Sequence, residues 1–191
     1  KPVGEVGGGI ANAIVGTLML IVIACGIAIP LGVFSGIYLS ERKEGKLVYL
    51  VRLSVEILQG IPSIVIGIIA YAWIVVVLGT FSAFSGGIAL SIMMLPVIVR
   101  ATEETLRLIP DTLKEASLSL GVPYYRTILK VILPAGASGI ATGVLISVAR
   151  IAGETAPLLF TAFGNPFMEM NILKPVNSLP LLIFNYATSP Y

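Results

Sequence analysis

Three long intervals of the chain contain no charged residue, and each is strongly apolar. They cover residues 6–40, 57–99 and 131–149. A helix needs about 20 apolar residues to cross the hydrocarbon core of a bilayer. The first and third intervals each open one such helix, and the second is long enough for two, because turn-forming residues at 80–86 divide it. The pattern therefore predicts four membrane-spanning helices.

We place these spans at about 10–39, 61–78, 82–99 and 134–160. The fold class that follows is an all-α membrane protein, a polytopic helical bundle that forms a single domain over residues 1–191. The apolar segment near the end of the chain is too short to span alone and contains a proline. We therefore expect it to lie on the outside, against the bundle.

The basic residues orient the spans. Nine of the twelve Lys and Arg residues lie in two segments between spans: Arg42, Lys43, Lys46, Arg52, Arg100, Arg107, Lys114, Arg126 and Lys130. Because cytoplasmic loops of membrane proteins are enriched in Lys and Arg, both segments are predicted to be cytoplasmic. Residues 1–9, 80–86 and 162–191 then lie outside. This orientation needs an earlier span, so we expect the sequence to be an internal piece of a longer chain.

The composition excludes several other classes of protein. Hydrophobic residues make up 57% of the chain and charged residues 12%, whereas a soluble domain has about 25% charged residues. There is no histidine and one cysteine, Cys25, which excludes a disulfide framework, a Cys/His metal site and histidine acid–base chemistry. No G-x-x-x-x-G-K-[ST] loop is present, so ATP hydrolysis would need a partner subunit. We expect a protein that is not an enzyme, holds no cofactor or metal, and binds no nucleic acid.

The segment 40–60 is predicted to be a cytoplasmic amphipathic helix. Arg52, Glu56 and Gln59 follow the helical spacing i, i+4, i+7 and form one polar stripe on an otherwise apolar segment. Such a helix can lie in the interface between membrane and cytoplasm. A plain connector held by an Arg52–Glu56 ion pair fits the spacing equally well.

The predicted cytoplasmic loop 108–130 contains a short helix with its own start and stop signals. Thr112 and Glu115 match a T-x-x-E capping box, and Gly121, with a proline two residues later, ends the helix. Leu118 has no lipid to cover it, which indicates a groove on a partner protein. The alternative is that the helix folds back under its own bundle.

The same loop resembles the EAA signature of ABC importer permeases. That signature, E-A-A-x-x-x-G followed nine residues later by I-x-L-P, is matched by Glu115-Ala116-Ser117, Gly121 and Val131-Ile132-Leu133-Pro134. Ser117 replaces the second alanine, and Val131 replaces the isoleucine. The resemblance implies that this helix couples the permease to a separate ATPase subunit. The coupling residues would be Thr112, Lys114, Glu115, Ala116, Leu118 and Gly121.

Two charged residues, Arg150 and Glu154, interrupt the last predicted span. They are four residues apart, and we place them on one face of a helix that Gly153 and Pro157 weaken. A charge inside a membrane costs roughly 2.5–3.5 kcal/mol on insertion scales, so such residues usually face a transport pathway or each other. We favour the pathway, and the alternative is an ion pair that only holds helices together.

Residues 149–160 resemble the PstA-type permeases of bacterial phosphate importers, and supporting resemblances run along most of the chain. The resemblance implies an ABC importer type I permease fold with six spans in the full chain, located in the cell membrane. It also implies inward transport of inorganic phosphate by alternating access. The partners would be a second permease subunit, ATP-binding ATPase subunits, an extracytoplasmic phosphate-binding protein and the lipid bilayer.

On this resemblance, Arg150, Glu154 and Arg100 would line the substrate pathway. A guanidinium offers paired donors that match the oxygens of phosphate, and Glu154 could accept from Arg150 when phosphate is absent. Arg100 has an equally good explanation as a residue that extends to the cytoplasmic interface.

Other functions remain as alternatives. The companion PstC-type permease usually reads Gly-Glu-Thr-Met-Ala at 153–157, where this chain reads Gly-Glu-Thr-Ala-Pro. A permease for another oxyanion or for amino acids would share the coupling helix. An ion channel has no need of that helix, and a membrane-embedded enzyme is disfavoured by the lack of histidine.

Two G-x-x-x-G motifs lie inside predicted spans, at 32–36 and 139–143. Paired glycines allow the backbones of neighbouring helices to approach closely. These motifs predict packing, not function.

Overall fold

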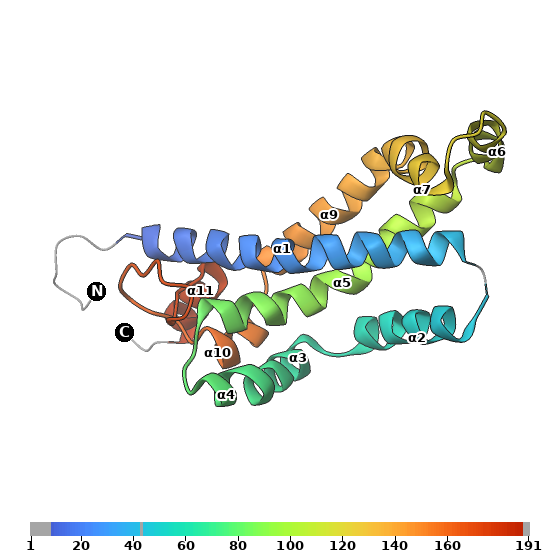
Figure 1. Cartoon of the computed structure of the whole chain (residues 1–191). Coiled ribbons are helices and arrows are strands. Elements are labelled where there is room, and N and C mark those ends of the chain that lie inside the picture. The colour runs from blue at the N-terminus through green and yellow to red at the C-terminus, as the bar shows by residue number, and fades with distance from the viewer. Residues whose placement is uncertain (1–8, 43, 189–191) are drawn as a thin grey trace. The chain divides into compact units, whose positions relative to one another are not determined.

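The computed structural model describes residues 9–42 and 44–188, and their regular secondary structure is helical (Figure 1). Phe163 and Val176 form an isolated β-bridge. The helices are α1 (Ala11–Glu41), α2 (Lys46–Gly60), α3 (Ser63–Ala70), η1 (Tyr71–Val75), α4 (Val76–Leu78), α5 (Ala83–Arg107), α6 (Asp111–Ser119), α7 (Tyr124–Thr127), η2 (Ile128–Ile132), α8 (Leu133–Ala135), α9 (Ala137–Ala152), α10 (Ala156–Thr161) and α11 (Leu179–Thr188). The predicted all-α fold class is confirmed.

Two of these helices, α1 and α5, are each long and apolar enough to cross a membrane. Two bent pairs also qualify if each is counted as one broken span: α2 with α3–α4, and α7–α8 with α9, the latter bent by 66°. The described residues therefore allow between two and four spans. The predicted boundaries of the spans and of the cytoplasmic segments stay predictions.

The span predicted over 134–160 contains a break at the point that Gly153 and Pro157 were predicted to weaken. Helix α9 ends at Ala152, and α10 begins at Ala156 with Pro157 in its first turn. Proline has no N–H to donate and its ring clashes with the preceding turn, so Pro157 disfavours a continuous helix here but fits the first turn of a new one. The backbone N–H groups of Gly153 and Glu154 instead make tight i−3 bonds of 3.3 and 3.2 Å to Arg150 and Ile151.

The contacts divide the chain into two compact units. The first unit contains residues 1–27, 60–94 and 148–191, and the second contains 28–59 and 95–147. Helices α1, α5 and α9 each contribute residues to both units.

In the first unit, the loop after α10 covers the start of α5. The backbone N–H groups of Ser82, Ala83 and Phe84 donate to the carbonyls of Thr161, Lys174 and Ile172 at 3.0, 3.0 and 2.9 Å. The first N–H groups of a helix have no partner within the helix, so these bonds satisfy them. Helix α3 packs on α10, where a Cβ at Gly67 would lie 2.7 Å from Pro157.

In the second unit, both G-x-x-x-G motifs face α5, and the predicted close packing is confirmed. A Cβ added at Gly32 or Gly36 of α1 would lie 2.7 Å from Ile98 and 2.5 Å from Thr102. A Cβ at Gly139 of α9 would lie 2.5 Å from Thr105, and one at Gly143 would overlap Ala101. Helix α5 is therefore the shared partner of α1 and α9 in this unit.

Candidate coupling site and candidate pathway residues

The short helix α6 follows α5 after a turn at 108–110, but the predicted capping box is wrong. The residue before the helix is Pro110, in an extended conformation with φ −60° and ψ 135°, and no side chain caps the helix start. Thr112 therefore lies inside the first turn and not at the N-cap. Asp111 in that turn interacts favourably with the positive end of the helix dipole.

The predicted stop at Gly121 is confirmed. Gly121 has φ +77°, a left-handed conformation that glycine adopts without a Cβ penalty. Its N–H donates to the Leu118 carbonyl at 2.9 Å, and the next N–H, of Val122, donates to Ser117 at 3.3 Å. These bonds satisfy carbonyls that the end of the helix leaves free.

Most side chains of α6 are exposed, including those predicted to contact an ATPase subunit, except Lys114. Leu113 and Leu118 are 44% and 39% exposed, and Leu120 just beyond the helix is 84% exposed. The buried residue of α6 is Ser117, whose hydroxyl lies 2.9 Å from that of Thr127 in α7. Serine at the second alanine position of the signature thus faces inward, while the leucines remain uncovered. The helix does not bury them under its own unit.

Lys114 joins α6 to two other elements. Its ammonium and the Tyr124 hydroxyl both donate to the same carboxylate oxygen of Glu41, the last residue of α1. The ammonium also lies 4.9 Å from the centre of the Tyr124 ring. Burial lowers the pKa of Lys114, but its hydrogen bonds to Glu41 and Tyr124 outweigh this and hold the pKa above its usual range. Lys114 is therefore a cation tied to α1 and α7.

A second ionic cluster lies beside α2. Glu103 of α5 accepts from Arg52 and from Arg107, both at 2.8 Å, and its side chain is only 11% exposed. Arg107 also donates to the Leu39 carbonyl of α1 at 3.2 Å.

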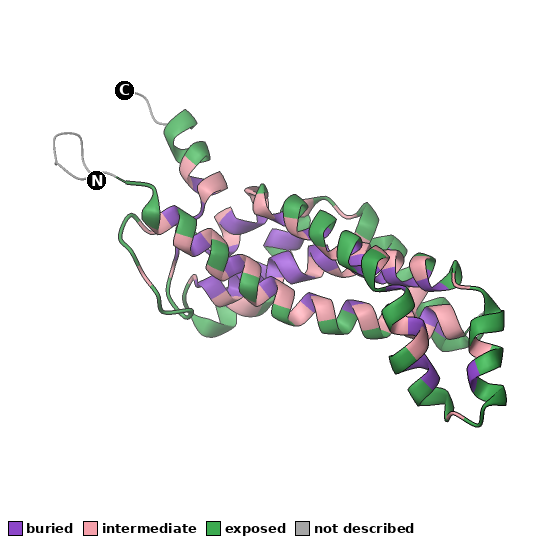
Figure 2. Cartoon of the chain, turned by 90° about the horizontal axis from the view of Figure 1, so that it is seen from above, coloured by how far each residue is buried: buried purple, intermediate pink, exposed green. Residues whose placement is uncertain are grey.

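The polar stripe of α2 thus faces α5, and the alternative of an Arg52–Glu56 pair is wrong. Arg52 pairs with Glu103, while Glu56 lies 3.7 Å from Arg100. Val48 and Val55 of α2 are buried against Leu39 and Val99. Figure 2 shows exposed residues along the helices, and several of the large exposed residues of α2 are apolar. Its exposed apolar residues are Leu47, Tyr49, Leu50, Leu53 and Ile57.

The three predicted pathway residues are not gathered into one site within either unit. Arg100 belongs to the second unit, where its guanidinium is 43% exposed and lies near Glu56. Arg150 and Glu154 belong to the first unit. Arg150 is exposed at the end of α9, and Glu154 is half-buried in the break that follows. Helix α9 ends at Ala152, before Glu154, so the prediction that the two residues share one helix face is wrong. Among the described residues, no ion pair joins them.

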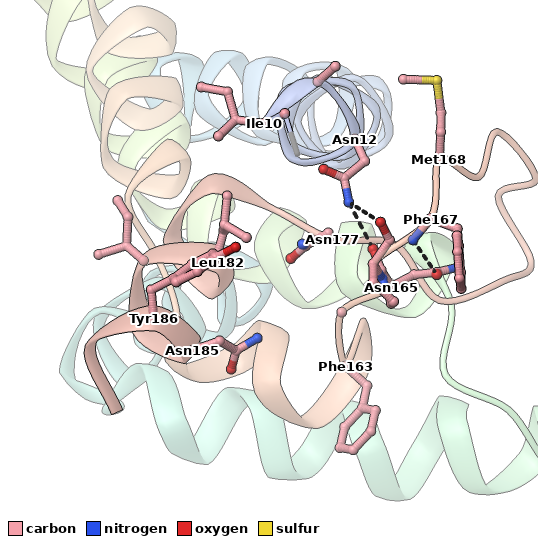
Figure 3. A pocket seen from close by; sticks show the side chains of 15 residues that line it. Ile10, Asn12, Phe163, Asn165, Phe167, Met168, Asn177, Leu182, Asn185 and Tyr186 are labelled. Atoms are coloured by element: carbon pink, nitrogen blue, oxygen red, sulfur yellow. Dashed lines mark hydrogen bonds between the residues drawn. The ribbon is translucent and has the colours of Figure 1, made fainter. Parts of the chain in front are cut away.

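The first unit also contains a cavity of about 940 Å³ that the sequence did not predict (Figure 3). Asn12 of α1 donates to the carbonyls of Asn165 and Pro166 at 3.1 and 3.0 Å across its wall. Its other polar side chains include Asn177 and Asn185, and no described lining residue is charged. Such a lining suits neutral hydrogen-bonding groups and offers no cation to an anion. Neither Arg150 nor Glu154 lines it.

Comparison with known proteins places these features in a family. Residues 28–187 match the family described as the inner membrane component of binding-protein-dependent transport systems. The phosphate transport system permease protein PstA of Yersinia pestis is 44% identical over 191 residues, which is all of this chain and 65% of that protein. PstA of Xylella fastidiosa strain 9a5c is 46% identical over 186 residues, 96% of this chain and 65% of the relative. The chain thus spans slightly less than two thirds of these relatives.

Solved structures show the same fold. One chain of the MetNI methionine ABC transporter, in inward-facing conformations, matches 96% of this chain and 80% of its own length with a TM-score of 0.73 at 23% identity. A second crystal form gives a TM-score of 0.68, also at 23% identity, over 94% of this chain and 78% of that one. At this identity the likeness concerns the fold alone.

The family match covers most of the described helices. The chain therefore belongs to the family of inner membrane components of binding-protein-dependent transport systems.

Proposed function

We propose that the chain is the membrane permease of an ATP-driven phosphate importer. The observation that carries this proposal is its 44–46% identity, over 96–100% of its length, to PstA permeases of phosphate transport systems. In this role it forms part of the translocation pathway in the inner membrane. It works with a second permease subunit, with ATPase subunits and with an extracytoplasmic phosphate-binding protein.

Helix α6 is the proposed docking element for the ATPase subunit. Its exposed leucines, Leu113 and Leu118, provide an apolar surface outside the candidate spans. Apolar anchors on one short helix suit insertion into a groove of a partner protein. The left-handed Gly121 ends the helix sharply, so its position relative to α7 is well defined. Thr112, Glu115 and Ala116 form the polar and small rim of this surface.

Arg150 is the proposed contact for phosphate. Its guanidinium is exposed and, in the described residues, has no carboxylate partner. It lies beside a helix break, where backbone groups that are free of helical bonds need a polar or wet surrounding. Glu154 in that break and Arg100 on α5 would serve the same route. The pairing of Arg150 with Glu154, which the helical spacing predicted, is not used in this proposal.

The test is transport by the complete protein, assembled with the partner subunits of its own transport system in liposomes. Radiolabelled phosphate should accumulate in an ATP-dependent manner, and excess sulfate, molybdate or methionine should not compete. Competition by one of those solutes, with no phosphate accumulation, would assign the chain to a permease of different specificity.

A variant of the exposed surface tests the docking role. Leu118→Asp places a charge on the apolar face of α6 and should greatly reduce co-purification of the ATPase subunit. The control is Tyr125→Asp, which changes an exposed residue of α7, outside α6. Equal loss in both variants would mean that α6 is not the docking element.

A further inference from the structure

We propose that Glu41 is a positioning residue for coupling, which holds α6 rigidly to the end of α1 through Lys114 and Tyr124. This inference rests on the proposed function, because it concerns how movement at α6 reaches the spans. It assigns a role to the last residue of α1 and to the first residue of α7, neither of which carries a part of the resemblance described above.

The contacts of α6 within its unit are few. Among described residues, its side chains make two hydrogen-bonded links to other elements: Ser117 to Thr127, and Lys114 to Glu41. The first link joins α6 to α7, its neighbour in sequence. The second joins it to α1, 73 residues earlier. The link to α1 therefore depends on one ion pair.

The position of Glu41 is unfavourable for α1 itself. The C-terminal end of a helix carries a partial negative charge, so a carboxylate there is destabilising. Helix α1 has no basic residue in its last turn. The compensating cations come from other elements: Lys114 of α6 binds the carboxylate, and Arg107 of α5 donates to the Leu39 carbonyl at 3.2 Å. The Glu41 carboxylate is thus stabilised by residues of other helices and not by α1 itself.

The Lys114–Glu41 ion pair is also partly shielded from water. The side chains of Lys114 and Glu41 are 25% and 17% exposed, less than those of ordinary surface pairs. Exposed pairs contribute little because water and salt screen them. In a partly buried pair, removal of one member leaves the other charge poorly solvated, so the link resists separation. The raised pKa of Lys114 agrees with a cation stabilised by this carboxylate.

The shared oxygen of Glu41 connects three elements at once. Because Lys114 and Tyr124 both donate to it, the ends of α1, α6 and α7 meet at one carboxylate. A displacement of α6 by an ATPase subunit would then move the end of α1 with it. Without the carboxylate, α6 could tilt about its remaining link to α7 while α1 stays in place.

The experiment measures the coupling ratio, phosphate imported per ATP hydrolysed, in the complete importer reconstituted in liposomes. Glu41→Gln should lower this ratio about fivefold or more, the lower end of typical coupling effects, while the ATPase subunit still co-purifies. The matched control is Glu44→Gln, an exposed acid three residues later with no described ion pair, which should leave the ratio unchanged. The double variant Glu41→Lys with Lys114→Glu should recover most of the ratio, because it restores the pair with reversed charges.

An unchanged ratio in Glu41→Gln, or a double variant that assembles without recovery, would overturn the inference. If Glu41→Gln fails to assemble, Lys114→Met replaces it, since it removes the same ion pair from the side of α6; a normal ratio in that variant also overturns the inference. Failure of the proposed function is distinguishable. In that case Leu118→Asp would leave ATPase co-purification intact, or the unaltered importer would transport no phosphate.

Discussion

Arg150 and Glu154 are neighbours in sequence but belong to different local structures. Arg150 lies in the last turn of α9, and Glu154 lies in the break before α10. Gly153 and Pro157 predict a weak point, and the break lies there, but helical spacing cannot relate two residues once the helix has ended. An exposed guanidinium that has no carboxylate partner among the described residues is available for a ligand. The two explanations of Arg150 can therefore be separated by experiment.

Arg150→Lys is expected to lower phosphate uptake about tenfold or more, because an ammonium keeps the charge but loses the paired, planar donors. Arg150→Leu should abolish uptake, and adding Glu154→Leu should not restore it. The measurement is uptake per assembled complex. Lys174→Leu, which removes an exposed cation paired with Glu169 at 3.2 Å, is the control and should transport normally. Full uptake by the double variant would mean that Arg150 only neutralises Glu154.

Glu41 shows what residue patterns miss. The sequence identifies it as one acid in a charged segment, and nothing local distinguishes it from Glu44. Its partners Lys114 and Tyr124 are 73 and 83 residues away. The useful signal was an acid at the end of a long helix that has no basic residue in its last turn, a position that the helix dipole disfavours.

At the scale of elements, α2 illustrates how far periodicity reaches. The spacing of Arg52 and Glu56 correctly predicts a helix with one polar stripe. It cannot predict what covers that stripe, because the covering charges, Glu103 and Arg100, lie on α5. Arg52 binds a largely buried carboxylate, whereas Glu56 stays 56% exposed. The helix also exposes several leucines. Glycine and proline act locally on the backbone, so the positions where helices end were predictable from them. The capping box was not, because α6 begins directly after Pro110, earlier than the T-x-x-E pattern implied.

The two ion pairs between α2 and α5 should differ in strength. Glu103→Gln leaves Arg52 and Arg107 without their shared carboxylate and should destabilise the protein by about 2 kcal/mol or more. Glu56→Gln removes a pair at 3.7 Å whose side chains are 43% and 56% exposed, and it should cost about 0.5 kcal/mol or less. The free energy of unfolding in mixed detergent micelles measures both. An equal loss of unfolding free energy in the two variants would contradict the expectation that the more buried ion pair is the stronger one.

At the scale of the whole molecule, the positions of the basic residues predict which side of the membrane each loop occupies. A version in which Cys25 is replaced by alanine allows single cysteines at Thr80 and Glu44, both exposed. An impermeant thiol reagent added outside intact cells should label Thr80→Cys and not Glu44→Cys. Permeabilisation should make the second site reactive, as the control for its accessibility. External labelling at Glu44→Cys would reverse the orientation and remove α6 from the cytoplasm.

The first unit contains both described ends of the chain, so it can form only late in synthesis. Asn12 donates to carbonyls 153 and 154 residues later, and the Thr17 hydroxyl accepts from the backbone of Leu179. At about 5–20 residues per second, the ribosome needs roughly 8–30 s to make the second partner of each contact. During that interval the first half of α1 has already been made. The Asn12 amide still lacks its carbonyl partners, and the Thr17 hydroxyl, which donates to Ala13 within the helix, still lacks the Leu179 donor. The second unit, whose residues end at 147, can assemble earlier. During insertion, the start of α1 is therefore expected to need temporary polar surroundings, such as an insertion factor. This need lasts until α11, which begins at Leu179, has been synthesised.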